Sequence, residues 1–279
     1  MLKAVVSSPM MLEYLDQNSS VGPNSRGAKK RRGLNENLAR ELLELHTVGV
    51  GAAYTQTDVR QLAELLTGMS TKEGSGFVFR AKIAEPGAET VLGQTYGGGP
   101  PLVDDVMEFL DDVALRPVTA AHISRKIAVH FTSDQPDPGM ISEMADVYLA
   151  SGGKLQTVYE VMLRHPFTWE SFGQKVKQPV DFIVSALRVL EVPPASLHKL
   201  NRTKRNAYVI APMTAMGQRW FRPNGADGWP EVEEAWVTAQ GLAARIQWAM
   251  SAPSAFFRSL PDPREFVASA LGGQSICDA

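Results

Sequence analysis

The chain has 279 residues, of which 44% are hydrophobic and 21% are charged, and its net charge is −2. This composition predicts a soluble globular protein and excludes a disordered or fibrous one. The near-neutral charge gives no reason to expect a nucleic-acid-binding protein. The single cysteine, Cys277, excludes an internal disulfide and a cysteine-based metal site.

No apolar run approaches the ~18 residues that a membrane-spanning helix needs. The first residues, MLKAVVSSPMMLEYLDQ, reach Glu13 and Asp16 too early for a signal peptide. The sequence therefore predicts neither a membrane span nor a signal peptide. It does not indicate the cellular compartment.

The chain begins with a helix predicted over residues 2–16, which Pro9 interrupts. Residues 17–33 (QNSSVGPNSRGAKKRRG) predict a flexible basic loop. Its basic run, residues 29–32, would suit a nucleic-acid or localisation patch. Because no aromatic residues are interleaved with it, a solvated loop is the favoured interpretation.

Two amphipathic helices are predicted next, over residues 34–48 and 54–69. Residues 77–93 favour a small hairpin around Glu85-Pro86-Gly87, within a Gly/Pro-rich insertion that reaches residue 101. From residue 102 onward the pattern is helix after helix without a fixed repeat, over roughly 102–115, 117–132, 140–151, 154–164, 179–191, 195–216, 231–250 and 263–271.

These elements predict a mainly α fold, a multi-helix orthogonal bundle with one small β-hairpin insertion near residues 77–93. No linker is long enough to force two domains, so a single helical domain over residues 1–279 is expected.

The stretch LNENLARELLELHTVGV, residues 34–50, places leucines on one side of a helix and ionisable residues on the other. Glu36, Arg40 and Glu44 form a ladder of alternating charge, in which each exposed pair contributes only ~0.2–0.5 kcal/mol. Glu41 and Glu44 are three residues apart, so their carboxylates could share a metal ion or a proton. His46 lies about 200° around the helix from Glu44, and the motifs Glu-x-x-His and His-Glu-x-x-His are absent.

No metal site is therefore predicted in this helix, although a metal stays the least favoured of three interpretations. The other two are a solvent- or partner-facing polar surface and a polar functional cleft. Asn37 belongs to the same polar side.

The stretch HISRKIAVHF, residues 122–131, places His122, Lys126 and His130 within about 80° of one another on a helix. Lys126 between the histidines would repel a cation, so a basic stripe is favoured over a metal site. The acidic side of residues 36–44 is the partner expected for this stripe, with which it would form an internal salt-bridge network.

The stretch MGQRWFRPNGADGWP, residues 216–230, combines aromatic residues with two turn signals. It would suit the rim of a ligand pocket, or a loop that tryptophans hold against the core. The candidate binding residues here are Gln218, Arg222, Asp227 and Trp229. No Gly-x-Ser-x-Gly elbow supports a serine nucleophile.

Residues 35–69, NENLARELLELHTVGVGAAYTQTDVRQLAELLTGM, resemble the segment that defines a large uncharacterised bacterial family, domain of unknown function 1800. Further landmarks of the family occur as PVTAAHISRKIAVHFTSD, LRHPFTW, KVKQPVDFIVSALRVL and MGQRWFRPNGADGWPEVEEAW, so the resemblance covers nearly the whole chain. Met69 stands where the family usually has Trp, and His165 where it tends to have a small polar residue. Family members begin with an additional helical region, so we expect this chain to be the C-terminal part of a larger family domain.

The resemblance implies no established activity. It implies that full-length members are exported bacterial proteins. Their genes often lie beside genes of a second uncharacterised family, domain of unknown function 1501. That second family itself looks like relatives of sulfatases and phosphatases, and its members are the expected protein partners.

Two functions are expected from these observations. The first is a helical binding or assembly module of an exported or envelope-associated system, since no recognised catalytic constellation is present. The alternative is an enzyme with hydrolase-like acid/base chemistry and no cofactor. Its cleft would combine the polar side of residues 36–44, the 122–130 helix and the 216–230 loop. Glu41 or Glu44 would act as general acid/base, Arg40 or Arg125 would hold an anionic group, and the other members would be Asn37, His122 and His130.

Overall fold

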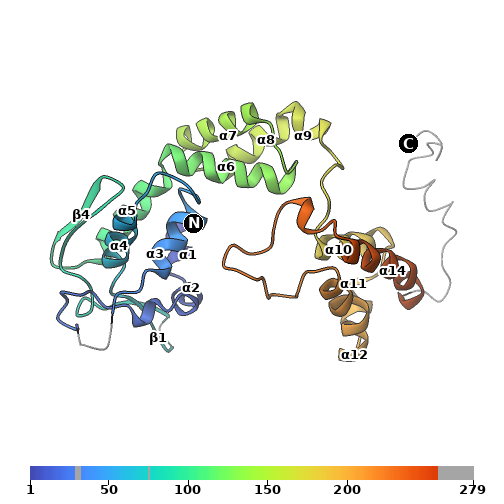
Figure 1. Cartoon of the computed structure of the whole chain (residues 1–279), viewed down its shortest axis with the longest axis horizontal. Coiled ribbons are helices and arrows are strands. Elements are labelled where there is room, and N and C mark those ends of the chain that lie inside the picture. The colour runs from blue at the N-terminus through green and yellow to red at the C-terminus, as the bar shows by residue number, and fades with distance from the viewer. Residues whose placement is uncertain (29–32, 75, 257–279) are drawn as a thin grey trace. The chain divides into compact units, whose positions relative to one another are not determined.

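The computed structural model describes residues 1–28, 33–74 and 76–256 (Figure 1). The basic run at 29–32, the helix predicted over 263–271 and Cys277 lie outside the described residues. The chain falls into two compact units, Met1–Phe172 and Gly173–Ala279. The mainly α fold is confirmed, while the single domain over 1–279 stays a prediction.

The first unit opens with short helices that surround one apolar core. They are α1 (Leu2–Val6), α2 (Pro9–Tyr14), the 3₁₀ turn η1 (Gln17–Ser19), α3 (Asn37–Glu41), the π-helical turn η2 (Leu42–His46) and α4 (Gln56–Leu65). Leu38, Leu42, Leu62 and Leu66 are completely buried in this core, as the helical period predicts. Met69 is buried there too, so the family's usual Trp position is a core position.

The predicted loop 17–33 is partly packed. Gln17, Ser20 and Val21 are buried, and the Gly22 N–H donates to the Ile83 carbonyl at 2.9 Å. Asn18 accepts hydrogen bonds from Ser70 and Thr71. These contacts fasten the first half of the segment to the hairpin region.

The β structure differs from the single predicted hairpin, because two antiparallel hairpins are present. Strand β1 (Met69–Lys72) pairs with β2 (Gly76–Phe79), and β3 (Gly87–Val91) pairs with β4 (Gln94–Gly99). The second turn is Leu92-Gly93, where both residues have positive φ (51° and 79°), as a tight two-residue hairpin turn requires. The Pro86-Gly87 pair opens β3 instead of reversing the chain.

The rest of the first unit is α5 (Val103–Ala114), α6 (Pro117–Phe131), α7 (Pro138–Ala150), α8 (Leu155–Arg164) and α9 (Pro166–Glu170). Helices α6, α7 and α8 share a second core, in which Ala120 and Ala128 of α6 meet Met140 and Met144 of α7. His165 caps α9, since its Nδ1 accepts from the Phe167 N–H at 3.3 Å.

The second unit contains α10 (Pro179–Val189), α11 (Pro194–His198), α12 (Arg202–Arg205), the π-helical turn η3 (Asn206–Ile210), α13 (Ala211–Ala215), the 3₁₀ turn η4 (Glu233–Ala235) and α14 (Ala239–Phe256). The helix predicted over 195–216 is therefore broken into pieces. Ile183, Met213 and Trp248 belong to a separate core of this unit. Of the helices within the described residues, none has the length and apolarity needed to cross a membrane.

Candidate functional site

The charged ladder of the opening helix forms one connected network around Arg40. The guanidinium lies 3.4 Å from Glu44 Oε1 and 3.5 Å from Glu36 Oε2, and it donates to Gln56 Oε1 at 2.9 Å. Gln56 Nε2 donates to Glu36 Oε2 at 2.8 Å, and the Tyr54 hydroxyl donates to Glu44 Oε1 at 2.9 Å. We call these five side chains the Arg40 network.

The local sequence explains why the network forms. Thr55 caps α4 in a reciprocal capping box with Asp58, which fixes Gln56 in the first turn of α4. The buried leucines of α3 and η2 turn the opposite side of that helix, with Arg40, towards this turn. The network therefore joins α3 to the start of α4.

The network is half-exposed. The side chains of Glu36, Arg40 and Glu44 are 34%, 42% and 25% exposed, so water screens their attraction. Burial, followed by the hydrogen bond to Glu44, raises the pKa of the Tyr54 hydroxyl above its ordinary value. Each carboxylate that Arg40 contacts also accepts a neutral donor, as expected for a network that fastens two helices together.

Two other members of the predicted site lie near this network. Glu41 is half-buried on the last turn of α3. Asn37 is exposed, and its backbone N–H donates to Asn35 Oδ1 at 2.8 Å. Asn35 in turn donates to the carbonyls of Leu15 and Asp16. Asn35 was not among the predicted site residues, although its side-chain oxygen closes an Asx turn on the backbone two residues ahead, as asparagine commonly does.

Helix α6 meets the opening helix at Leu45 and His46, which directly follow residues 36–44. The Leu45 carbonyl is hydrogen-bonded to His122, and Lys126 acts electrostatically on both His46 and His122. We call His46 and His122 the histidine corner. The acidic side chains of the Arg40 network are bound by Arg40, Gln56 and Tyr54.

Both imidazoles of the histidine corner have pKa values that are lowered by burial. Burial is the largest cause that lowers the pKa of both imidazoles below the ordinary 6.5, and Lys126 lowers them further. The Nε2 atom of His122 is buried and, within the described residues, has no hydrogen-bond partner. Gly49 has φ +93°, and a Cβ there would overlap the His122 ring, so this position requires glycine.

The remaining candidates of α6 lie further along the helix. Arg125 is exposed. His130 is exposed two turns beyond His122, and its ring meets Phe131 edge-on at 4.5 Å. The structure thus brings His122, but not the whole predicted stripe, to the opening helix.

The 216–230 loop belongs to the second unit, where two buried side chains hold it. Gln218 is 4% exposed; its Oε1 accepts from the Val180 N–H at 2.7 Å, and its Nε2 donates to Gln178 Oε1. Buried Trp236 donates to the Pro230 carbonyl at 3.0 Å and packs against Trp229. Gln218 and Trp236 therefore anchor the loop, and Trp229 packs against the second anchor.

The other two candidates of the loop are exposed. They are Arg222 and Asp227.

A group of buried carboxylates surrounds Glu89 and was not predicted from the sequence. Glu89 shares the inward side of β3 with Val91 and is 5% exposed. Burial, and then the charges of Glu85, Glu64 and Asp105, raise its pKa to about 7. The only signal in the sequence is a Glu that alternates with Val91 on a strand.

The neighbours of Glu89 have their own donors. Arg60 and Gln61 donate to the Glu64 carboxylate. The Asn24 backbone N–H and side-chain amide both donate to Glu85. Within the described residues, His, Cys, Asp and Glu side chains do not gather in a group of three or more that could hold a metal ion.

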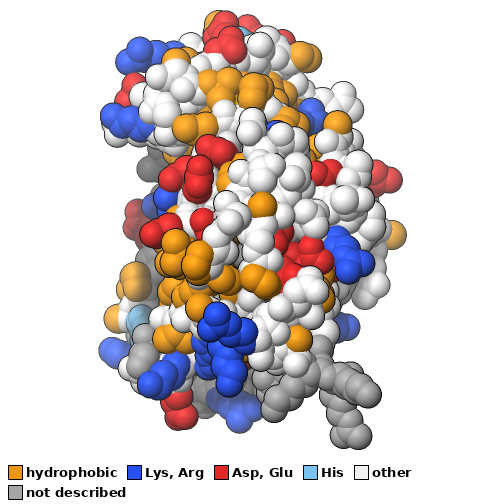
Figure 2. Space-filling view, turned by 90° about the vertical axis from the view of Figure 1, so that its left-hand side faces the viewer, with side chains coloured by type: hydrophobic (Ala, Val, Ile, Leu, Met, Phe, Trp, Pro, Cys, Tyr) orange, Lys and Arg blue, Asp and Glu red, His pale blue; other side chains and the backbone are white. Residues whose placement is uncertain are grey.

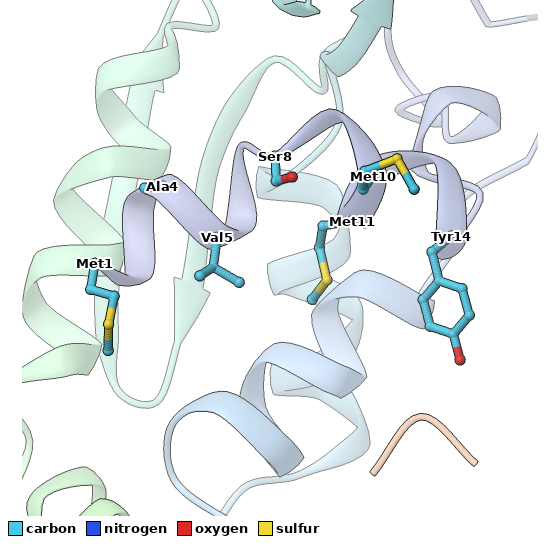
Figure 3. A pocket seen from close by; sticks show the side chains of 7 residues that line it. All are labelled: Met1, Ala4, Val5, Ser8, Met10, Met11 and Tyr14. Carbon is cyan, nitrogen blue, oxygen red and sulfur yellow. The ribbon is translucent and has the colours of Figure 1, made fainter. Parts of the chain in front are cut away.

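An open hollow of roughly 610 Å³ lies along α1 and α2 (Figure 3). Six of its lining residues offer mainly apolar surface, and Ser8 is the seventh; the six are Met1, Ala4, Val5, Met10, Met11 and Tyr14. Met10 and Tyr14 are 77% and 65% exposed. Figure 2 shows that hydrophobic side chains also gather in exposed groups beside charged ones.

Comparison with known proteins identifies a family. No curated protein and no solved structure matches the chain. The model of one family matches residues 1–275, and that family is described as a protein of unknown function, DUF1800. The match spans far more than half of the 279 residues. The chain therefore belongs to the DUF1800 family.

Proposed function

We propose that the chain is a non-catalytic helical binding or assembly module that holds a protein partner. The observation that carries this proposal is the open hollow along α1 and α2. Hollows with a mainly apolar lining are common sites for binding an apolar segment of a partner.

The chemistry of the hollow favours an apolar helix as the bound segment. Methionine side chains are unbranched and adapt to irregular partners, and three of them, Met1, Met10 and Met11, line the hollow. Grooves of this kind take the apolar side of an amphipathic helix in several recognition modes. The hydroxyl of Tyr14 adds a polar group at one end.

The family resemblance supports a setting for this module. Members of the family resemble exported bacterial proteins and are often encoded beside domain of unknown function 1501. We therefore propose an envelope-associated role and a member of that second family as the partner.

The test is binding between the purified chain and the product of such a neighbouring gene, followed by calorimetry. Met10→Lys places a charge in the hollow and is expected to raise the Kd about tenfold or more. Val50→Lys is the matched control, since Val50 is 76% exposed, like Met10 at 77%, and does not line the hollow. Absence of a complex, or equal effects of the two variants, would refute the proposal.

The histidine corner favours the alternative, an enzyme with hydrolase-like acid/base chemistry. Its two imidazoles have lowered pKa values, so both are available in the neutral form that a general base requires. It also begins in a π-helical turn, and such turns occur frequently at functional sites.

This alternative predicts hydrolysis of p-nitrophenyl esters, tested with acetate, phosphate and sulfate. His122→Asn should abolish the activity, while His198→Asn, at an exposed position of the second unit, should retain it. Inactivity of the wild-type chain on all three esters, or equal activity of both variants, would count against this alternative.

A further inference from the structure

The tip of the 216–230 loop presents two aromatic rings and two cations to solvent. It consists of Arg219, Trp220, Phe221 and Arg222, which we call the RWFR tip. Trp220 is 50% exposed and Phe221 is 83% exposed. Their rings contact each other edge-on, with centroids 4.7 Å apart. In Figure 1 the tip lies in the long open connection between α13 and α14.

The backbone holds these rings outward. The Arg222 N–H donates to the Arg219 carbonyl at 3.2 Å, which closes a tight turn with Trp220 and Phe221 at its centre. Phe221 has φ +50°, in the left-handed region that a bulky side chain rarely adopts. Strain of this kind persists only where the surrounding structure enforces it, and it is concentrated at functional segments.

The base of the loop supplies that enforcement. Gln218, which immediately precedes the tip, is buried and bonded to Gln178 and Val180 at the start of α10. At the other end, Trp236 holds the Pro230 carbonyl. The tip is therefore presented by a loop that is fixed at both ends.

We propose that the RWFR tip binds a lipid surface that carries anionic phosphate headgroups. Tryptophan prefers the interface between headgroups and acyl chains, and phenylalanine gains by leaving water for the acyl region. Arginine binds phosphate in a bidentate manner while its stem lies along apolar surface. The two arginines give the tip a local charge of opposite sign to such headgroups.

Size favours a bilayer over a protein surface for this tip. A stable protein interface buries ~800 Å² on each partner and involves about 20–30 residues a side. A bilayer accepts a small wedge of a few side chains from any projecting loop. The acidic side chain of the same loop, Asp227, lies against Gly225 in a separate turn. This inference goes beyond the proposed function and does not depend on it.

The first unit offers a matched comparison. Trp169 and Phe172 are 62% and 79% exposed, with ring centroids 6.4 Å apart. The charged residue between them is Glu170, so this pair has the aromatic surface of the RWFR tip without its cations.

The test is co-sedimentation of the full chain with vesicles of phosphatidylglycerol mixed with phosphatidylcholine, and with vesicles of phosphatidylcholine alone. We expect the wild-type chain to bind the anionic vesicles and to lose binding as salt is raised. The double variant Trp220→Ser/Phe221→Ser should lower the affinity roughly tenfold or more, and Arg219→Gln/Arg222→Gln by a similar factor. Trp169→Ser/Phe172→Ser should bind like the wild-type chain.

Three outcomes would overturn the inference. They are no binding of the wild-type chain to anionic vesicles, equal binding to both vesicle types, and equal losses from the two aromatic double variants. Binding to soluble polyglutamate without binding to vesicles would assign the tip to an acidic protein surface instead. Melting curves check that each variant is folded, and the arginine variant, which keeps both rings, provides an independent test if the aromatic variant is not.

Discussion

The first unit contains two groups of carboxylates that differ in what surrounds them. Glu36 and Glu44 are half-exposed, and an arginine, a glutamine and a tyrosine bind them. Glu89 is buried, and its strongest electrostatic neighbours are other carboxylates. The comparison teaches that charge density in a sequence motif does not indicate where the electrostatic free energy is concentrated. Burial and the sign of the neighbours decide it.

The largest effect is expected from Glu89→Gln, measured as a function of pH. The pKa of Glu89 is about 7 in the folded chain and near the ordinary 4.5 when unfolded. Between these values the folded state retains a proton that the unfolded state has lost, so wild-type stability falls as pH rises, and no further above about 7. A glutamine cannot ionise, so the variant should be more stable than wild type at pH 8, by up to roughly 3 kcal/mol.

The measurement is calorimetric unfolding of both chains at pH 4 and pH 8. At pH 4 the two should melt alike, because Glu89 is then protonated in both states. Glu73→Gln, on an exposed turn, is the matched control and should show no such divergence. A wild-type chain that parallels Glu89→Gln from pH 4 to pH 8 would show that the pKa of Glu89 is the same in the folded and the unfolded chain.

The second prediction concerns Arg40→Gln, which removes the centre of the exposed group. It leaves Glu36 and Glu44 without their cation, but both side chains can turn to water. We therefore expect the free energy of unfolding to fall by ~1–2 kcal/mol. Urea unfolding should show this loss at low salt and a smaller one in 1 M NaCl. A loss of several kcal/mol that salt does not change would show that the Arg40 network behaves like a buried group. It would contradict the contrast with Glu89.

The Arg40 network could be predicted from the sequence in part, and the group of carboxylates around Glu89 could not. The reason is physical. The contacts of Arg40 with Glu36 and Glu44 follow from four-residue spacing on a helix, which is local. Tyr54 and Gln56 enter the same network because α4 packs beside α3, which spacing alone does not give. Glu89 acquires its surroundings from the segment directly before β3 and from α4 and α5, two helices on either side of it in the sequence.

The same distinction holds for the fold. Leucine periodicity predicted the helices around the first core, because one helix side must be apolar to be buried. The small β insertion was predicted, but its turn was placed at Pro86-Gly87, because the turn at Leu92-Gly93 lacks the usual Asn-Gly or Asp-Gly signal. The helix predicted over 195–216 is interrupted at 199–201, where the Asn201 side chain caps α12 by accepting from the Lys204 N–H, a capping signal that the leucine pattern does not contain.

The third prediction is Tyr54→Phe, which deletes one hydroxyl from the Arg40 network. Its hydrogen bond to Glu44 is charge-assisted but only partly buried, so the expected loss is about 0.5–1.5 kcal/mol. In a double-mutant cycle with Glu44→Gln, the coupling energy should account for most of that loss. Additive effects would mean that the hydroxyl of Tyr54 contributes to stability independently of the Glu44 carboxylate.

The smallest effect is expected from Glu36→Gln. Glu36 accepts from Gln56 at 2.8 Å and lies 3.5 Å from Arg40, and a glutamine oxygen retains the first contact. Only a screened attraction is lost, so the free energy of unfolding should change by roughly 0.3 kcal/mol, within the range of exposed helical pairs.

Glu64→Gln is the informative counterpart of Glu36→Gln, since Glu64 is 9% exposed and its charge acts on Glu89. If removing the Glu64 charge lowers the pKa of Glu89 in an NMR titration while removing the Glu36 charge leaves it unchanged, the two groups are electrostatically separate. A shift from both substitutions would join them into one system.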